Sequence, residues 1–155
     1  MKTRKRAPEH NGVLDVCEEL GIGFVPWGPV GMGFLTGQMT AETRFDPATD
    51  YRHQFPRFSP ENLEANLPIL DIVRRKAVQK GRTPAAVSLA WLLAQRPFIV
   101  PIPGTRNMAH LDENHTALSV LLTEKDLCEM QAVFASLSVH GESMDSLNMS
   151  LCERA

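Results

Sequence analysis

The spacing of hydrophobic residues predicts helices in five stretches of the chain. In each stretch apolar side chains recur three and four residues apart, which places them on one helical face. Ser59 and Thr83 each stand directly before a proline, a pair that is typical of the start of a helix, and Pro68 predicts a kink or a break inside the second stretch. The apolar face of the first helix consists of Val13, Val16, Cys17 and Leu20. The predicted helices cover about residues 9–20, 60–80, 84–96, 108–117 and 124–137.

Two short apolar runs, bounded by glycine and proline, predict strands. Ile22–Trp27 and Phe98–Ile102 contain no polar side chain, which is typical of strands buried on both faces. Strands that alternate with helices predict an α/β fold, so we expect the two strands to be adjacent and parallel, joined by a right-handed crossover. Because two parallel strands alone would leave their edges unprotected, the pattern indicates a part of a larger fold.

Two polar stretches interrupt this pattern. The first, from about Thr36 to Ser59, has no clean period, and a loop of such length is often functional. The second begins at Ser138 and is rich in small residues. We expect it to form an irregular C-terminal tail over about residues 138–155.

The composition is that of an ordinary globular protein. Of the 155 residues, 43% are hydrophobic and 22% are charged. The net charge of −2 provides no basic field for nucleic acid or a membrane surface, and no apolar run approaches the ~20 residues of a membrane helix. Cys17, Cys128 and Cys152 have the spacing of neither a disulfide framework nor a zinc site. We therefore expect a cytoplasmic protein without a metal, a nucleic-acid partner or a membrane partner.

Each predicted strand is followed by a loop, at the position where parallel α/β folds place their ligand sites. In the second loop, backbone amides at the start of the next helix attract an anion, and Thr105 and Arg106 offer donors to a phosphate. Glu113 and Asn114 follow on that helix, within reach of a nucleotide base. The alternative is a capped helix start with a solvated arginine, and the residues alone do not decide between these interpretations.

The first loop, residues 28–33, is rich in glycine and follows Trp27. Glycine allows the backbone to approach a ligand closely, and an indole can stack on a flat ring. The alternative is a glycine-rich turn with Trp27 in the core, because such a loop is a weak signal by itself.

Several segments, in the same order and with the same spacing, resemble the aldo-keto reductases. They are Gly21–Gly37, similar to the seventh-strand region; Phe55–Leu63, similar to the loop and helix entry that follow; Thr83–Gln95, similar to the next helix; Ile99–Arg106 with Leu111–Asn114, similar to the eighth strand and nucleotide loop; and Val139–Gly141, similar to the start of the C-terminal tail. The resemblance implies an α/β fold that is a partial TIM (β/α)8 barrel, made of its last two strands and their flanking helices. Residues 1–155 would then be the C-terminal segment of an NADP-dependent oxidoreductase domain, beginning just after the sixth strand.

The resemblance also implies a binding site for NADP(H). The aromatic residue at position 27 would stack on the nicotinamide, residues 28–33 would line the pyrophosphate, and residues 104–106 would hold the 2′-phosphate. The expected cofactor-binding residues are Trp27, Gly28, Pro29, Val30, Gly31, Gly33, Gly104, Thr105, Arg106, His110, Glu113 and Asn114, the last three near the adenine. The family usually has Ser at Gly28 and Leu at Val30, and often a basic residue at Met32 and Arg at His110. Each departure weakens the expected site.

Members of this family reduce aldehydes and ketones with a tyrosine acid supported by lysine, aspartate and histidine. All of these lie in an earlier part of the barrel, so we expect no catalytic residue here and no activity of the chain alone. Tyr51, the only tyrosine, is interpreted as a solvated or packing residue. The alternative function is a non-enzymatic fragment or interaction module, whose exposed strand edges pair with another copy or with a complementing barrel fragment.

Overall fold

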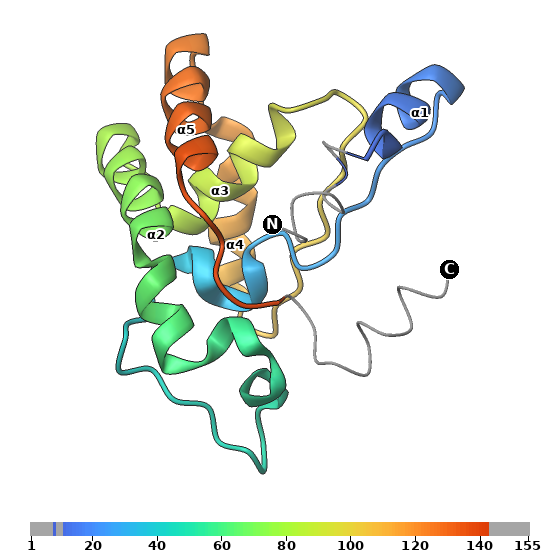
Figure 1. The fold of residues 1–155 in the computed structure, drawn as a ribbon. Coiled ribbons are helices and arrows are strands. Elements are labelled where there is room, and N and C mark those ends of the chain that lie inside the picture. Colours follow the sequence, from blue (N-terminus) through green and yellow to red (C-terminus); the bar gives the residue numbers. More distant parts are fainter. Residues whose placement is uncertain (1–7, 9–10, 143–155) are drawn as a thin grey trace.

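The computed structural model describes residue 8 and residues 11–142. In this part of the chain, α2 (Pro60–Lys80), α3 (Pro84–Leu93) and α5 (Glu124–Ser136) pack side by side (Figure 1). The shorter helix α4 (Met108–His115) lies next to α3, whereas α1 (Val13–Leu20) lies apart from this group (Figure 1). The described 3-10 helices are η2 (Gly31–Thr36), η3 (Tyr51–Gln54), η4 (Pro56–Phe58) and η5 (Thr116–Ser119).

Local capping signals start the main helices where the sequence predicts them. The hydroxyl groups of Ser59 and Thr83 each accept a backbone N–H of the following first turn, at 3.3 and 3.2 Å. Thr123 and Asp126 cap α5 reciprocally, since each side chain accepts the backbone N–H of the other. These short-range bonds use N–H groups that have no partner inside the helix, and they explain why the helix starts follow the sequence pattern.

Helix α2 continues through Pro68, so the predicted break is absent. Pro68 is exposed, and the buried side chains of Leu63, Leu70 and Val73 lie on the inner face of the same helix. Packing of that face against α3 and α5 outweighs the single backbone hydrogen bond that a proline removes. The ends of two other helices also differ from the prediction: α3 ends at Leu93, and α4 ends at His115, followed by η5.

The main hydrophobic core lies between α2, α3 and α5. Its buried members are Ile72, Val73, Ala77, Val87 and Met130. Trp91 of α3 packs edge-on against Phe134 of α5 at its margin, with ring centroids 5.4 Å apart. We refer to α2, α3 and α5, packed around this core, as the helical base.

The two segments predicted as strands lie next to each other in parallel orientation, as expected. Phe24 pairs with Ile99, and Trp27 pairs with Ile102. The N–H of Phe24 donates to the Phe98 carbonyl at 2.9 Å, and its own carbonyl accepts the N–H of Val100 at 2.9 Å. In the described residues these contacts are isolated bridges and not regular strands.

The prediction that both segments are buried on two faces is wrong. Val25, Trp27, Val100 and Ile102 are all more than half exposed, whereas Ile99 is buried. Burial of a strand depends on its neighbours, and within the described residues no further strand pairs with either segment. The alternating apolar side chains therefore face solvent on one side.

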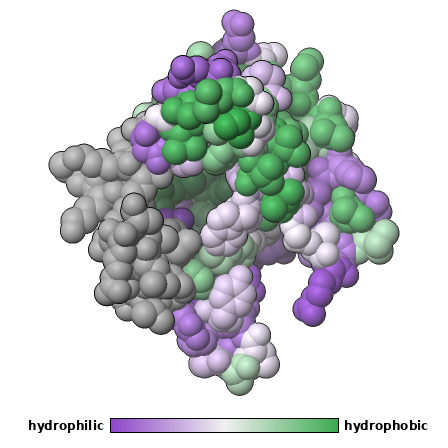
Figure 2. Space-filling model, turned by 90° about the vertical axis from the view of Figure 1, so that its right-hand side faces the viewer, coloured by the Kyte–Doolittle hydropathy of each residue, from purple (hydrophilic) through white to green (hydrophobic). Residues whose placement is uncertain are grey.

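Hydrophobic side chains are also exposed on α1. The helix ends at Leu20, as predicted, and is followed by Gly21 in the left-handed conformation, but Val13, Val16 and Leu20 are 40–64% exposed. The expected apolar face is therefore not the buried one, because α1 contributes only Leu14 to the core. Figure 2 shows hydrophobic residues gathered on the face that contains this helix. No described helix is long and apolar enough to cross a membrane.

Candidate functional site

The two loops that the sequence assigns to ligand binding lie side by side. The first loop, residues 28–33, follows Trp27, and the second, residues 103–107, follows Ile102. Because Trp27 and Ile102 form a parallel bridge, both loops leave the paired segments in the same direction. Trp27 is 62% exposed, so its indole is open to a ligand next to both loops.

Val30 anchors the glycine-rich loop to the helical base. Its carbonyl accepts the backbone N–H groups of both Gly33 and Leu35, at 3.2 and 3.1 Å. Its side chain packs against a buried cluster formed by Ala86, Leu89 and Ala117. The loop is therefore attached to α3 and η5 through Val30. The sequence predicted a loop that a ligand can approach closely, but it did not indicate this attachment.

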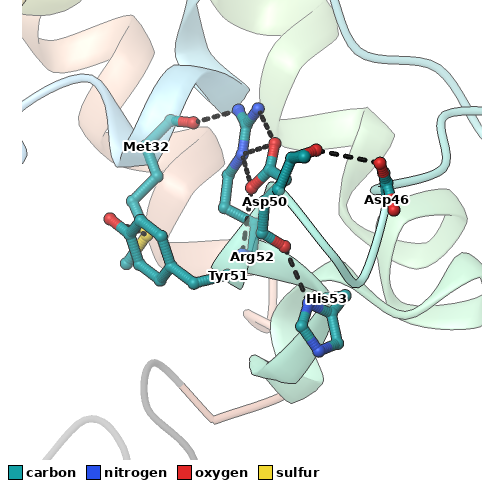
Figure 3. Close-up of polar contacts among 7 residues, drawn as sticks. Met32, Asp46, Asp50, Tyr51, Arg52 and His53 are labelled. Carbon is teal, nitrogen blue, oxygen red and sulfur yellow. Dashed lines mark hydrogen bonds and ion pairs between the residues drawn. The ribbon is translucent and has the colours of Figure 1, made fainter.

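The backbone of this loop turns through the left-handed region at Met32 and Gly33. Met32 has φ 52° and ψ 35°, and Gly33 has φ 93°. For a residue with a side chain, this conformation costs about 1–2 kcal/mol. The Met32 carbonyl accepts a hydrogen bond from Arg52 Nη1 at 2.9 Å, from a residue 20 positions further along the chain (Figure 3).

Arg52 is itself held by Asp50. The Arg52 Nε donates to Asp50 Oδ1 at 2.9 Å, and Nη2 donates to Oδ2 at 2.5 Å (Figure 3). This paired contact holds the pKa of Asp50 below its usual value and that of Arg52 above its usual value. The guanidinium also lies over the ring of Phe45, 4.5 Å from its centroid. The sequence did not predict this cluster, because only the length of the polar stretch from about Thr36 to Ser59 indicated a function.

The second loop prepares the start of α4. Thr105 Oγ1 accepts the backbone N–H of Asn107 at 3.1 Å, and Asn107 Oδ1 accepts that of Ala109 at 2.9 Å. These bonds occupy two amide groups of the helix start, so an anion would meet those of Met108 and His110. The Arg106 side chain is exposed and makes no ion pair or hydrogen bond with the described residues.

An open hollow of about 330 Å³ lies over this second loop. It is lined by residues 103–108 and Leu111, so the predicted phosphate ligands Gly104, Thr105 and Arg106 share one surface. The lining does not include three predicted residues of α4, His110, Glu113 and Asn114. It also does not include Trp27 or residues 28–33. His110 is exposed, and the other two α4 residues are half-buried.

Two further features concern metal-ligating side chains and Tyr51. Among them, no three His, Cys, Asp or Glu side chains group closely enough to hold a metal ion. Tyr51 is 61% exposed, its hydroxyl lies 4.0 Å from the Met32 sulfur, and its ring packs edge-on against Phe55. In the described part of the chain no lysine contacts it.

Comparison with known proteins gives the family. The model of the Aldo/keto reductase family matches residues 5–135. The chain belongs to the aldo-keto reductase family. It is 42% identical over 118 residues to probable aldo-keto reductase 1 of Glycine max, and 38% identical over 130 residues to aldo-keto reductase yakc of Schizosaccharomyces pombe, whose name specifies NADP(+). Aldo-keto reductase str7 of Strobilurus tenacellus is 34% identical over 130 residues.

These matches cover most of this chain but only part of each relative. They include 76% of the chain and 34% of the Glycine max protein, and 84% of the chain and 38% of each of the other two. The chain therefore spans little more than a third of the length of these aldo-keto reductases.

Solved structures agree at the level of fold. The glycerol dehydrogenase AKR11B4 of Gluconobacter oxydans matches 80% of this chain with a TM-score of 0.71, and the match covers 37% of that enzyme. The thermostable aldo-keto reductase Tm1743, in a structure with the inhibitor epalrestat, matches 82% of the chain with a TM-score of 0.56, over 35% of its own length. Both are 23% identical to this chain, so these likenesses concern the fold alone.

Proposed function

We propose that residues 1–155 are the C-terminal segment of an NADP-dependent aldo-keto reductase. The segment would form the last two strands of a partial (β/α)8 barrel, with their flanking helices and an irregular tail from about residue 138. The parallel pairing of Phe24 with Ile99 and of Trp27 with Ile102 supports this assignment. The share of each relative that the match covers, 34–38%, supports a segment that is shorter than the whole barrel.

The proposed role of the segment is to bind NADPH. One observation carries this proposal: the Trp27–Ile102 bridge places the glycine-rich loop beside a second loop whose Arg106 is exposed and unpaired in the described part of the chain. A guanidinium in this position can bind a phosphate through two hydrogen bonds. Trp27 would stack on the nicotinamide, residues 28–33 would line the pyrophosphate, and residues 104–106 would hold the 2′-phosphate.

The adenine would lie against α4, near His110, Glu113 and Asn114. His110 stands where the family often has arginine, so this contact is expected to be weaker than in relatives. When bound, NADPH supplies a hydride to the carbonyl carbon of an aldehyde or ketone. The residues of this chain bind and orient it, and we assign none of them to proton transfer.

Nucleotide titration of the full chain tests this function. NADPH fluorescence should change on binding, and NADPH should bind more tightly than NADH, because only NADPH offers a 2′-phosphate to Arg106. Equal affinities, or the absence of binding to either nucleotide, would contradict the proposed role.

The exposed apolar residues of the paired segments favour a second candidate function, that of an interaction module. Val25, Trp27, Val100 and Ile102 are all more than half exposed, and Figure 2 shows hydrophobic residues gathered on one face of the molecule. Strand addition from a second copy or a complementing barrel fragment would pair with the exposed edges of these segments, and further packing of that partner would cover the apolar side chains. The free thiols of Cys17 and Cys128 fit the cytoplasmic setting of either function.

A further inference from the structure

We propose that Arg52 is a positioning residue, which holds the glycine-rich loop in the conformation that the nucleotide site needs. The inference rests on the proposed function for its consequence, nucleotide binding. The contact itself, between Arg52 Nη1 and the Met32 carbonyl, is a property of the chain without any ligand.

The Arg52 side chain is fixed on three sides before it reaches the loop. Asp50 takes the Nε and Nη2 donors at 2.9 and 2.5 Å and also accepts the backbone N–H of Arg52 at 3.0 Å. The ring of Phe45 lies under the guanidinium at 4.5 Å. Only the Nη1 donor is directed at the glycine-rich loop (Figure 3). A donor on so constrained a side chain can fix the position of the carbonyl that accepts it.

The loop has a particular need for this contact at Met32. Met32 is the only described residue other than glycine with a positive φ angle, and Gly33 directly after it is also left-handed. In this left-handed conformation the Met32 carbonyl points in a different direction from the one that it would take in an extended chain. In the described residues two other side chains make polar contacts with this turn: Thr36 Oγ1 donates to the Gly33 carbonyl, and the Tyr51 hydroxyl lies 4.0 Å from the Met32 sulfur. Arg52 is the distant side chain that bonds the backbone of the turn, whereas Tyr51 contacts only the Met32 side chain.

The contact also explains part of the long polar stretch that the sequence left without a role. Phe45 and Phe55 pack with Met32 and Phe34 against buried Met39, Phe58 and Leu63, so this stretch folds back beneath the glycine-rich loop. Asp50 and Arg52 lie where this stretch turns back toward the glycine-rich loop, at the start of η3. The stretch thus acts as a support whose polar contact with the loop is made by Arg52.

Substitution of Arg52 tests the inference on the full chain. Arg52→Gln removes the ion pair, and Arg52→Lys keeps the charge but cannot bind Asp50 through two nitrogens and reach Met32 as well. Arg44→Gln is the matched control, because Arg44 is exposed in the same stretch and donates only to the nearby carbonyls of Ala41 and Thr43.

Two readouts separate this inference from the proposed function. The first is hydrogen exchange of the Gly33 and Leu35 amides, which needs no nucleotide. Loss of the Arg52 bond should speed their exchange by about tenfold in both Arg52 variants, while the amides of α2 and the far-ultraviolet spectrum stay unchanged. Unchanged exchange at these two amides would overturn the inference, whether or not NADPH binds.

The second readout is NADPH affinity, which should fall by about tenfold in Arg52→Gln and Arg52→Lys and stay unchanged in Arg44→Gln. Met32→Gly distinguishes positioning of the turn from a general contribution of Arg52 to stability. Glycine adopts the left-handed turn without help, so Arg52→Gln should cost less affinity in the Met32→Gly background. Full NADPH affinity in the Arg52 variants would overturn the positioning role and leave the proposed function standing. An equal loss in both backgrounds would also overturn it.

Discussion

Arg52 and Arg106 illustrate at the scale of single residues how surroundings decide what an arginine can do. Arg52 has all its strong contacts within the protein, through Asp50, Phe45 and the Met32 carbonyl. Arg106 is exposed at the edge of a hollow and has no partner in the described part of the chain. The first therefore supports the fold of a loop, whereas the second is available to a ligand.

Arg106→Ala should weaken NADPH binding by about tenfold or more and leave NADH binding nearly unchanged. The reason is that a paired hydrogen bond between a guanidinium and a phosphate contributes on the order of 1.5–3 kcal/mol, and NADH lacks the 2′-phosphate. Fluorescence titration with both nucleotides measures the two affinities. Arg82→Ala is the control, because Arg82 is exposed at the start of α3 and donates only to the adjacent Gly81 carbonyl. An equal loss for both nucleotides would show that Arg106 does not read the 2′-phosphate.

The sequence indicated Trp27, Thr105 and Arg106 because Trp27 ends one recognisable apolar run and the other two residues follow shortly after the second run. It could not indicate Arg52, since its acceptor is a backbone carbonyl 20 residues away and every backbone has carbonyls. Nor did it indicate that Thr105 and Asn107 would satisfy amide groups at the start of α4 themselves. Contacts between side chain and distant main chain leave no pattern in a single sequence.

At the scale of elements, local signals proved more reliable than inferred burial. Ser59 and Thr83 cap their helices as predicted, and Thr123 also caps α5, because the capping hydroxyl and the N–H that it accepts lie within one turn. The burial of Ile22–Trp27 and the apolar face of α1 were wrongly predicted, because burial requires a neighbouring element. An apolar run shows that a segment can be covered, but not that the described chain covers it.

Helices α2 and α5 are joined by an ion cluster that the sequence did not predict. Lys76 of α2, whose side chain is 7% exposed, contacts Asp126 at 3.0 Å and Glu129 at 2.7 Å. Lys80 contacts the other oxygen of Asp126. The hydrogen bond from Lys80, with those from Thr123 and Lys76, holds the pKa of Asp126 well below its usual range.

This cluster predicts a specific loss of stability in acid. A carboxylate whose pKa is lowered by folding stabilises the protein above its unfolded pKa of about 4, and this contribution is lost progressively as the pH falls below that value. Asp126→Asn should therefore lower the free energy of unfolding by about 2 kcal/mol at pH 7, and the difference should shrink as the pH falls below about 4.

Urea unfolding followed by circular dichroism over a pH series measures this difference. Asp71→Asn serves as the control, since the Asp71 side chain is 60% exposed and lies 3.5 Å from Arg74 on the same helix. The account would be refuted if the free energies of unfolding of Asp126→Asn and of the unsubstituted chain differed as much at low pH as at pH 7. The loss of stability in acid could then not be assigned to this carboxylate.

At the scale of the whole molecule, the chain corresponds to little more than a third of the aldo-keto reductases that it matches. Resemblance predicted the family, and the parallel order of the two segments followed from the alternation of strands and helices. If the chain is the proposed segment of a larger barrel, the exposed apolar side chains of α1 and of the paired segments are ones that the rest of the barrel would cover.

The full chain should not oxidise NADPH in the presence of a reactive aldehyde. Hydride addition leaves an alkoxide that needs a positioned acid, which typically contributes about 10²–10⁴-fold to the rate. Tyr51 is exposed and packs on Phe55 without a lysine beside it in the described residues. Absorbance of NADPH measures the rate, and Tyr51→Phe should make no difference. Clear turnover that disappears in Tyr51→Phe would show a new active site at this loop.

An NMR titration of the isotope-labelled chain with NADPH tests most directly whether the two loops form one nucleotide site. The chain has two tryptophans: Trp27 is exposed beside both loops, whereas Trp91 packs against Phe134 in the helical core. We expect NADPH to shift the indole N–H signal of Trp27 together with the backbone amides of residues 28–33 and 104–106, and to leave the indole signal of Trp91 unchanged. Shifts in only one loop, shifts confined to other parts of the chain, or none at all would contradict the account.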